Sequence, residues 1–187
     1  MIFSPVYNCL SQNEFVFEDY KIVPIRYEDR LVIMKWRNEQ MYHLRQDKLL
    51  TEKSQEDYFN GTVAKLFDQE KPNQILFSYL INGNCIGYGG LVHIDWIDKN
   101  AEISFIMDTE LEGNFFQLHW SNFLYMLENL AFLELSFHKL YVYAFDLRPH
   151  LYEVLLALDY FRDATLKQHC CFNGEFLDVV IHSKLKS

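Results

Sequence analysis

Three glycines between Ile75 and Met107 are the first residues whose type and spacing indicate a binding site. Gly87, Gly89 and Gly90 fall inside a run that is otherwise rich in apolar, β-branched and aromatic residues, which is typical of a β-strand. Glycine weakens a strand and suits one only where a ligand or another backbone must come close. We therefore expect a ligand to bind beside the sheet that this strand belongs to.

Two further positions in the same stretch can carry acid–base chemistry. Glu102 is the one carboxylate in an otherwise apolar run and can act as a general base, directly or through water. The alternative is a surface carboxylate on the outward strand face. His93 and Asp95 fall on one face by alternation. As a pair they can hold substrate hydroxyls or relay a proton, or they can form a solvated strand end.

The cysteines do not form a recognisable metal or disulfide pattern. Cys9, Cys85, Cys170 and Cys171 lie far apart or directly adjacent, without a C-x-x-C spacing. His169 precedes the adjacent pair, but no fourth ligand stands at a natural distance for zinc. We expect buried or half-buried free thiols and no metal site.

The elements that position these residues follow from apolar periodicity and turn signals. Residues 75–107 predict three antiparallel strands, because Asn82-Gly83-Asn84 and the polar residues 95–100 interrupt three apolar runs. The flanking sequence predicts a strand at 20–26 with an edge or bulged Pro24, and a helix over 28–39. It also predicts a helix start at 51–54 and a helix N-terminus from Thr109, signalled by Glu110 and Glu112, which leads into a long apolar helix from about 115 to 135. A strand at 138–145, a helix after Pro149 and a hairpin at Asn173-Gly174 follow.

This order predicts an α+β fold, with a central mixed and mostly antiparallel sheet covered by helices on both faces. We expect a single domain over residues 21–187, preceded by an arm or short strand over residues 1–20. Apolar face positions Leu31, Met34 and Trp36 suit the first helix.

Composition narrows the classes of partner. The chain has 187 residues and a formal net charge of −9, and no Lys/Arg cluster offers phosphate neutralisation, so nucleic acid is not expected. No apolar run reaches the ~18 residues that span a membrane, and the N-terminus lacks a signal-peptide pattern, so we expect a cytoplasmic protein. A local pocket can still be positive on an acidic protein. The many aromatic residues make a homodimer plausible.

Several short segments also carry a resemblance to a known family. They are Trp36-Arg37-Asn38, Cys85-Ile86-Gly87-Tyr88-Gly89-Gly90, and residues 137–143, 151–161, 165–169 and 173–180. In their order and spacing they resemble the GNAT N-acetyltransferase superfamily, and within it the ribosomal-protein and amino-sugar acetyltransferase branch. The similarity spans residues 25–185.

The resemblance implies a fold, a co-substrate and a place where it binds. Members of this superfamily move an acetyl group from acetyl-CoA to an amine, and two neighbouring strands diverge to receive the pantetheine arm as an extra strand. In this chain those strands are residues 101–107 and 140–144, and the expected contacts are the backbone groups of Phe105, Ile106 and Met107. No metal is implied.

The sequence departs from the family where the pyrophosphate is bound. The glycine-rich loop expected at the start of the long helix is replaced near Gln117, by Leu118 and Trp120, while Gly113 and Asn114 lie upstream and can form a shifted loop. Either the backbone amides bind phosphate in a changed geometry, or CoA binding is weakened or lost. We assign to CoA binding the side chains or backbone of Gly113, Asn114, Gln117, Leu118 and Arg148.

The resemblance also implies roles at the reacting centre. Glu102 is the expected base and Tyr152 the candidate acid, while the expected acceptor contacts are Arg37, Asn38, Tyr88 and His93. The bland alternative for Arg37 and Asn38 is a helix C-terminal charge and cap. Direct attack by the amine is expected, because no cysteine stands in an activating environment.

The predicted function is acetyl-CoA-dependent N-acetylation of a small amine, favoured by the resemblance to be a nucleotide-linked amino sugar. One alternative is a protein N-terminal acetyltransferase, since an acidic surface suits a basic protein tail, whereas a nucleotide sugar requires a locally positive pocket. The other alternative is a catalytically inactive GNAT-fold binding protein.

Overall fold

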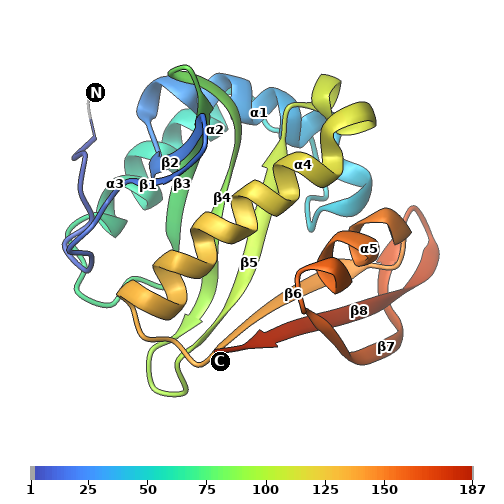
Figure 1. The fold of residues 1–187 in the computed structure, drawn as a ribbon. Helices are drawn as coiled ribbons and strands as arrows, with labels where there is room; N and C mark the ends of the chain where they lie inside the picture. Colours follow the sequence, from blue (N-terminus) through green and yellow to red (C-terminus); the bar gives the residue numbers. More distant parts are fainter. Residues whose placement is uncertain (1–2, 187) are drawn as a thin grey trace.

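A computed structural model describes residues 3–186, in which eight strands form one twisted sheet (Figure 1). The spatial order is β1-β2-β3-β4-β5-β6-β8-β7, and only the β5–β6 pair is parallel. The strands are β1 (Phe15–Phe17), β2 (Tyr20–Pro24), β3 (Ile75–Ile81), β4 (Asn84–Asp95), β5 (Asn100–Met107), β6 (Lys139–Phe145), β7 (Phe161–Phe172) and β8 (Glu175–Leu185).

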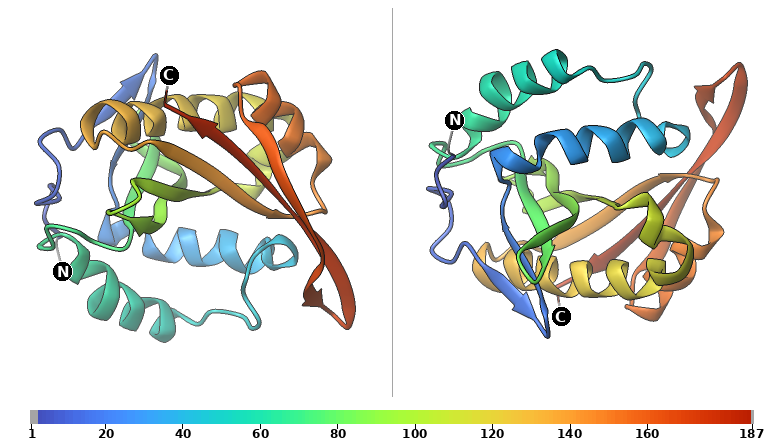
Figure 2. Two further views of the ribbon diagram at one scale, coloured as in Figure 1. Left: turned by 90° about the horizontal axis from the view of Figure 1, so that it is seen from below. Right: turned by 90° about the horizontal axis from the view of Figure 1, so that it is seen from above.

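Helices cover both faces of this sheet, which confirms the predicted α+β layout. Helices α1 and α2 lie on one face, and α4 and α5 lie on the other (Figure 2). The α-helices are α1 (Arg30–Glu39), α2 (Glu52–Tyr58), α3 (Ala64–Leu66), α4 (Thr109–Glu128) and α5 (Pro149–Ala157). Short 3-10 turns occupy Tyr27–Asp29 and Met41–His43, and π-helical turns occupy Phe59–Val63 and Asn129–Glu134.

The predicted three-strand meander is present as β3, β4 and β5, but its glycines face strands and not a ligand. A Cβ at Gly89 would lie 2.1 Å from the carbonyl oxygen of Ser104, and one at Gly90 would lie 2.0 Å from that of Ile75. The close approach of neighbouring backbones therefore explains these glycines. Of the two causes that the sequence allows, a ligand or another backbone, the second applies here, so these glycines do not indicate the ligand expected beside the sheet.

The N-terminal part of the chain resolves the open alternatives there. Residues 15–17 form the short edge strand β1, which pairs with Tyr20, Lys21 and Ile22 of β2. Pro24 lies beyond the end of β1, so its missing N–H leaves no ladder bond unmade on that side. In α1 the buried positions are Ile33 and Trp36, whereas the predicted Leu31 is 39% exposed.

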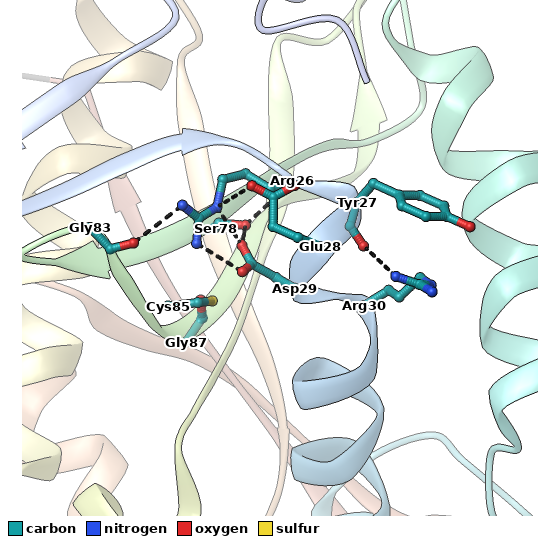
Figure 3. A network of polar contacts seen from close by, with 9 residues as sticks. All are labelled: Arg26, Tyr27, Glu28, Asp29, Arg30, Ser78, Gly83, Cys85 and Gly87. Atoms are coloured by element: carbon teal, nitrogen blue, oxygen red, sulfur yellow. Dashed lines mark hydrogen bonds and ion pairs between the residues drawn. The ribbon is translucent and has the colours of Figure 1, made fainter. Parts of the chain in front are cut away.

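A partly buried ion pair fixes the corner between β2 and α1 (Figure 3). Arg26 donates two hydrogen bonds to the Asp29 carboxylate, at 2.7 Å and 2.8 Å, and a third to the carbonyl of Gly83. Ser78 of β3 donates to the same carboxylate at 2.6 Å. The fork-shaped pairing sets the direction in which α1 leaves the sheet, and α1 carries Arg37.

Candidate active site

The cavity that defines the site opens where β5 and β6 part. The two strands pair over three positions only, from Asn100 with Lys139 to Glu102 with Tyr141. β6 instead pairs with β8 along its whole length, and this pairing carries it away from β5. A cavity of about 460 Å³ lies in the gap, lined by residues 102–105 and 142–145. The divergence predicted between residues 101–107 and 140–144 is therefore confirmed.

Glu102 is the last residue of β5 that pairs with β6, and it stands where the gap begins. Its side chain faces away from Phe105, which packs against Trp120 and Phe123 of α4 with ring centroids 5.2 Å and 4.1 Å away. Glu102 is 5% exposed, and both of its carboxylate oxygens are engaged. Glu102 is thus a buried carboxylate with a hydrogen bond to each oxygen, and not a surface carboxylate.

One partner of Glu102 is His93, whose Nδ1 lies 2.8 Å from Oε2. The register between β4 and β5 shifts between Val92 and Asp95, and His93 has a φ of 48°. Such a bulge inserts one residue and re-aims a side chain. The His93 side chain is 60% exposed and lines the cavity, so its second ring nitrogen is accessible.

The same bulge breaks the alternation on which the His93–Asp95 pair was predicted, and that pairing was wrong. Asp95 instead accepts hydrogen bonds from the backbone N–H groups of Ile97 and Asp98, each at 2.9 Å. Its carboxylate therefore stabilises the turn before β5, and Asp95 is not among the residues that line the cavity.

The second partner of Glu102 is Arg45, a residue that no sequence signal indicated. Its Nη2 donates to Glu102 Oε1, and its guanidinium carbon lies 4.6 Å from the centre of the Tyr143 ring. Arg45 thus bridges β5 and β6 across the mouth of the gap. It belongs to the irregular segment between α1 and α2, where no periodicity predicts the direction of a side chain.

Arg37 and Tyr88, both predicted acceptor contacts, meet directly. Arg37 Nη1 donates to the Tyr88 hydroxyl at 2.7 Å, and Arg37 Nε donates to Gln46 Oε1 at 3.1 Å. Arg37 lines the cavity, whereas Asn38 is not among its lining residues and bonds to both backbone groups of Leu50 and to Gln46. The acceptor role of Asn38 stays a prediction.

The expected loop at Gly113 and Asn114 does not form. α4 begins at Thr109 and is capped by Asp108, whose carboxylate accepts from the N–H of Glu110. Gly113 and Asn114 therefore lie in the second turn of α4, on its exposed side. The shifted loop was wrong because the helix starts earlier than the family pattern implies.

The remaining predicted CoA contacts lie on α4 and at the start of α5. Gln117 and Leu118 are exposed on α4, and Leu118 does not plug the gap, whereas buried Trp120 lines it. Arg148 is 6% exposed, donates to Glu112 of α4 and lies 4.9 Å from the Phe116 ring centre. The Nε of Arg148 is buried without a hydrogen-bond partner in the part of the chain described.

Arg148 also contacts His43, whose ring nitrogens lie 3.1 Å and 3.2 Å from Nη1. Burial, followed by the nearby Arg148 charge, lowers the pKa of His43 to about 3. His43 is therefore neutral at pH 7 and accepts a hydrogen bond from the guanidinium.

Tyr152, the candidate acid, lies outside the cavity wall. Its hydroxyl donates to Asp146 at 3.0 Å, and its ring stacks on His182. Burial and the Asp146 contact raise the pKa of Tyr152, which keeps the hydroxyl protonated. Tyr143 does line the cavity, and burial raises its pKa to about 12.

All four cysteines are free thiols, as predicted, although Cys171 is exposed and not half-buried like the others. Over residues 3–186 no group of three or more potential metal ligands comes together. No helix in the same range has the length and apolar character required to cross a membrane.

The arrangement of a sheet that splits between β5 and β6, with a cavity in the split, is that of an acetyltransferase fold. The sequence model of the acetyltransferase (GNAT) domain family matches residues 22–179, so the chain belongs to this family. It is an N-acetyltransferase of the class that takes acetyl-CoA as co-substrate. No curated protein gives a significant match.

Solved structures share the fold. Spermidine N-acetyltransferase SpeG from Vibrio cholerae, in complex with CoA and spermine, is similar with a TM-score of 0.77 at 18% identity, over 91% of this chain and 97% of that one. Mutant forms of the same enzyme give 0.77 at 17% identity, over 91% and 95%. The enzyme with manganese ions gives 0.73 at 19% identity, over 91% and 94%.

The residues of the gap fit acetyl-CoA in its pantetheine part. Beyond Glu102 the β6-facing edge of β5 has no strand partner, and main-chain groups of residues 103–107 are available to an extended ligand. The phosphate end differs from the family pattern, because the first turn of α4 is acidic, with Glu110 and Glu112. Arg148 supplies the cation on that side of the cavity.

Proposed function

We propose that this protein acetylates the amine of a small acceptor bound in the cavity between β5 and β6. The observation that carries the proposal is the three-residue pairing of these strands, which leaves the β5 edge free beside a held carboxylate. Acetyl-CoA supplies the acyl group as a thioester, and the acceptor amine attacks it directly. The backbone of Phe105, Ile106 and Met107 and the side chain of Arg148 are the proposed co-substrate contacts.

Glu102 serves as the base through His93. Both Glu102 oxygens are engaged, so the atom open to an acceptor is the second nitrogen of His93. As the amine nitrogen bonds to the acyl carbon and the carbon–sulfur bond breaks, the amine proton passes to His93 Nε2. Glu102 holds the ring in the tautomer whose Nδ1–H donates to the carboxylate.

Substitution of His93 and Glu102 tests this arrangement. Proton transfer by a positioned group contributes about 10²–10⁴-fold, so we expect His93→Gln to lower kcat by about 100-fold or more, with little change in CoA affinity. Glu102→Gln is expected to lower kcat less and to shift the pH–rate profile. Exposed His138 offers the matched control, His138→Gln. Unchanged turnover in His93→Gln would remove the base role from His93.

The acceptor favoured by the resemblance is a nucleotide-linked amino sugar. The similar SpeG structures name spermidine and spermine, so a polyamine is the competing acceptor. The two carry opposite charges, and the charge of the cavity wall therefore bears on the choice.

Isothermal titration with acetyl-CoA tests the proposal against the binding-protein alternative. We expect heat of binding for acetyl-CoA alone, and release of free CoA when an acceptor amine is added. Absence of heat and of a thermal shift at millimolar acetyl-CoA would overturn the enzymatic proposal.

A further inference from the structure

The wall of the cavity is positive although the protein as a whole is acidic. It carries three arginines, Arg37, Arg45 and Arg148, but one carboxylate, Glu102. Arg45 is neutralised by Glu102, and Arg148 by Glu112. Within residues 3–186 no carboxylate pairs with Arg37, so one guanidinium charge on this wall has no protein counter-charge.

Arg37 is held in place by neutral groups. Its two hydrogen-bond acceptors are the Tyr88 hydroxyl and the Gln46 amide oxygen, and Gln46 is itself buried and bonded to Asn38. The Nη2 of Arg37 makes no hydrogen bond to any residue that the structure describes. A partly buried cation is costly without an anion nearby, and the rigid hold on Arg37 orients it for one.

Arg45 adds further donors on the same wall. One of its N–H groups bonds to Glu102, while its Nε and Nη1 are free of hydrogen bonds to the described residues. The guanidinium is half exposed, and its carbon lies 4.6 Å from the centre of the Tyr143 ring. Arginine held by a carboxylate and a ring in this way suits bidentate binding of a carboxylate or a phosphate.

We infer that the acceptor amine belongs to a molecule that also carries a carboxylate or phosphate, and that Arg37 and Arg45 bind this anion. The inference rests on the proposed function for the reaction and adds the substrate class. A polyamine is positively charged at each of its amines and would face Arg37 without compensation. Polyamine acceptors are therefore disfavoured in this cavity, although a similar structure contains spermine.

Paired acceptors that differ in one anion test the inference. The probes are glucosamine 6-phosphate against glucosamine, alanine against alaninamide, and spermidine as the cation. We expect the anionic member of at least one pair to exceed its neutral partner at least tenfold in kcat/KM. The pair that responds distinguishes phosphate from carboxylate. Highest kcat/KM with spermidine would overturn the inference and leave the proposed function standing.

Arg37→Gln locates the anion site. Since a hydrogen bond to a charged group contributes about 1.5–3 kcal/mol, we expect kcat/KM for the anionic acceptor to fall about 10- to 100-fold, through KM, with no change for its neutral partner. Arg37→Lys should restore part of the loss. Lys35→Gln, which removes the same charge from an exposed position of α1, is the matched control.

Two further measurements keep the test decisive if the variant folds poorly or no amine is acetylated. In the wild type, salt should weaken the anionic acceptor and not the neutral one. Titration with glucosamine 6-phosphate or alanine in the presence of CoA should show binding that Arg37→Gln weakens by about the same 10- to 100-fold. Equal binding of the neutral partner, or an equal loss of CoA affinity in Arg37→Gln, would show that the guanidinium does not serve the acceptor.

Discussion

At the scale of single residues, the position of Glu102 was readable from the sequence and its partners were not. A lone carboxylate in an apolar strand is visible in the residue order. The approach of His93 depends on a one-residue bulge, and that of Arg45 on an irregular segment. His93 also adopts a left-handed backbone, which costs a non-glycine residue about 1–3 kcal/mol and concentrates at functional sites.

Two tyrosines, Tyr143 and Tyr152, are candidates for the acid that protonates the departing CoA thiolate. Tyr143 lies on the cavity wall under Arg45, with a pKa raised by burial to about 12, whereas the Tyr152 hydroxyl is bound to Asp146. We expect Tyr143→Phe to lower kcat by about 100-fold and Tyr152→Phe by less than about twofold, measured as steady-state CoA release. The reverse order would assign the acid to Tyr152, as the family resemblance implies.

At the scale of elements, those with local signals were predicted and those fixed by distant contacts were not. The Asn82-Gly83 and Asn173-Gly174 turns have both residues at positive φ, as tight hairpins require. The segment after α1 lacks such a turn signal. Its position depends on hydrogen bonds back to α1: Gln46 bonds to Arg37 and Asn38, and the Leu50 carbonyl accepts from Asn38.

The predicted position of the family's glycine-rich loop was wrong for a different reason. Counting from the next strand placed the pyrophosphate site inside α4, whereas the Asp108 cap starts the helix at Thr109. The sequence did signal this start through its acidic first turn, and the local cap was the better guide. Gly113, Asn114 and Gln117, the predicted phosphate contacts, lie on the exposed side of α4. Titration of their variants with CoA would measure whether they contribute to its binding.

Two glycines offer a matched stability experiment. In Gly89→Ala the new Cβ would lie 2.1 Å from the Ser104 carbonyl oxygen, so β4 and β5 must separate. We expect a loss of about 1–3 kcal/mol in the free energy of unfolding, measured by urea denaturation. Gly113→Ala meets nothing within 4 Å in α4 and should stabilise by about 0.5–1 kcal/mol. A neutral Gly89→Ala would contradict the close-approach explanation.

At the scale of the whole molecule, net charge and local charge point in opposite directions. The chain carries −9 overall, which suggests a cationic partner, yet the cavity wall concentrates arginine. Only the fold could show this, because Arg37, Arg45 and Arg148 come from separate elements. Homodimerisation stays a prediction, with exposed Phe161 and Phe176 on the β7–β8 hairpin as its first candidates.

Acid lability of the whole fold follows from four histidines whose pKa is lowered in the folded chain. Burial lowers the pKa of His43 to about 3, and it also lowers the pKa values of His119, His150 and His182. Below the ordinary histidine pKa of about 6.5, the unfolded chain takes up protons that the folded chain refuses. Stability therefore rises with pH across the range between the folded and unfolded pKa values.

His43 alone should cost about 2 kcal/mol of unfolding free energy between about pH 7 and pH 5, since each pKa unit corresponds to about 1.4 kcal/mol. Urea denaturation across this range measures the slope. His43→Gln is expected to reduce this slope, because no proton uptake by the unfolded chain remains at that position, while His119, His150 and His182 keep their contributions. Equal slopes in the wild type and in His43→Gln would show that the folded protein takes up the proton on His43, and the contact of His43 with Arg148 would then have to open.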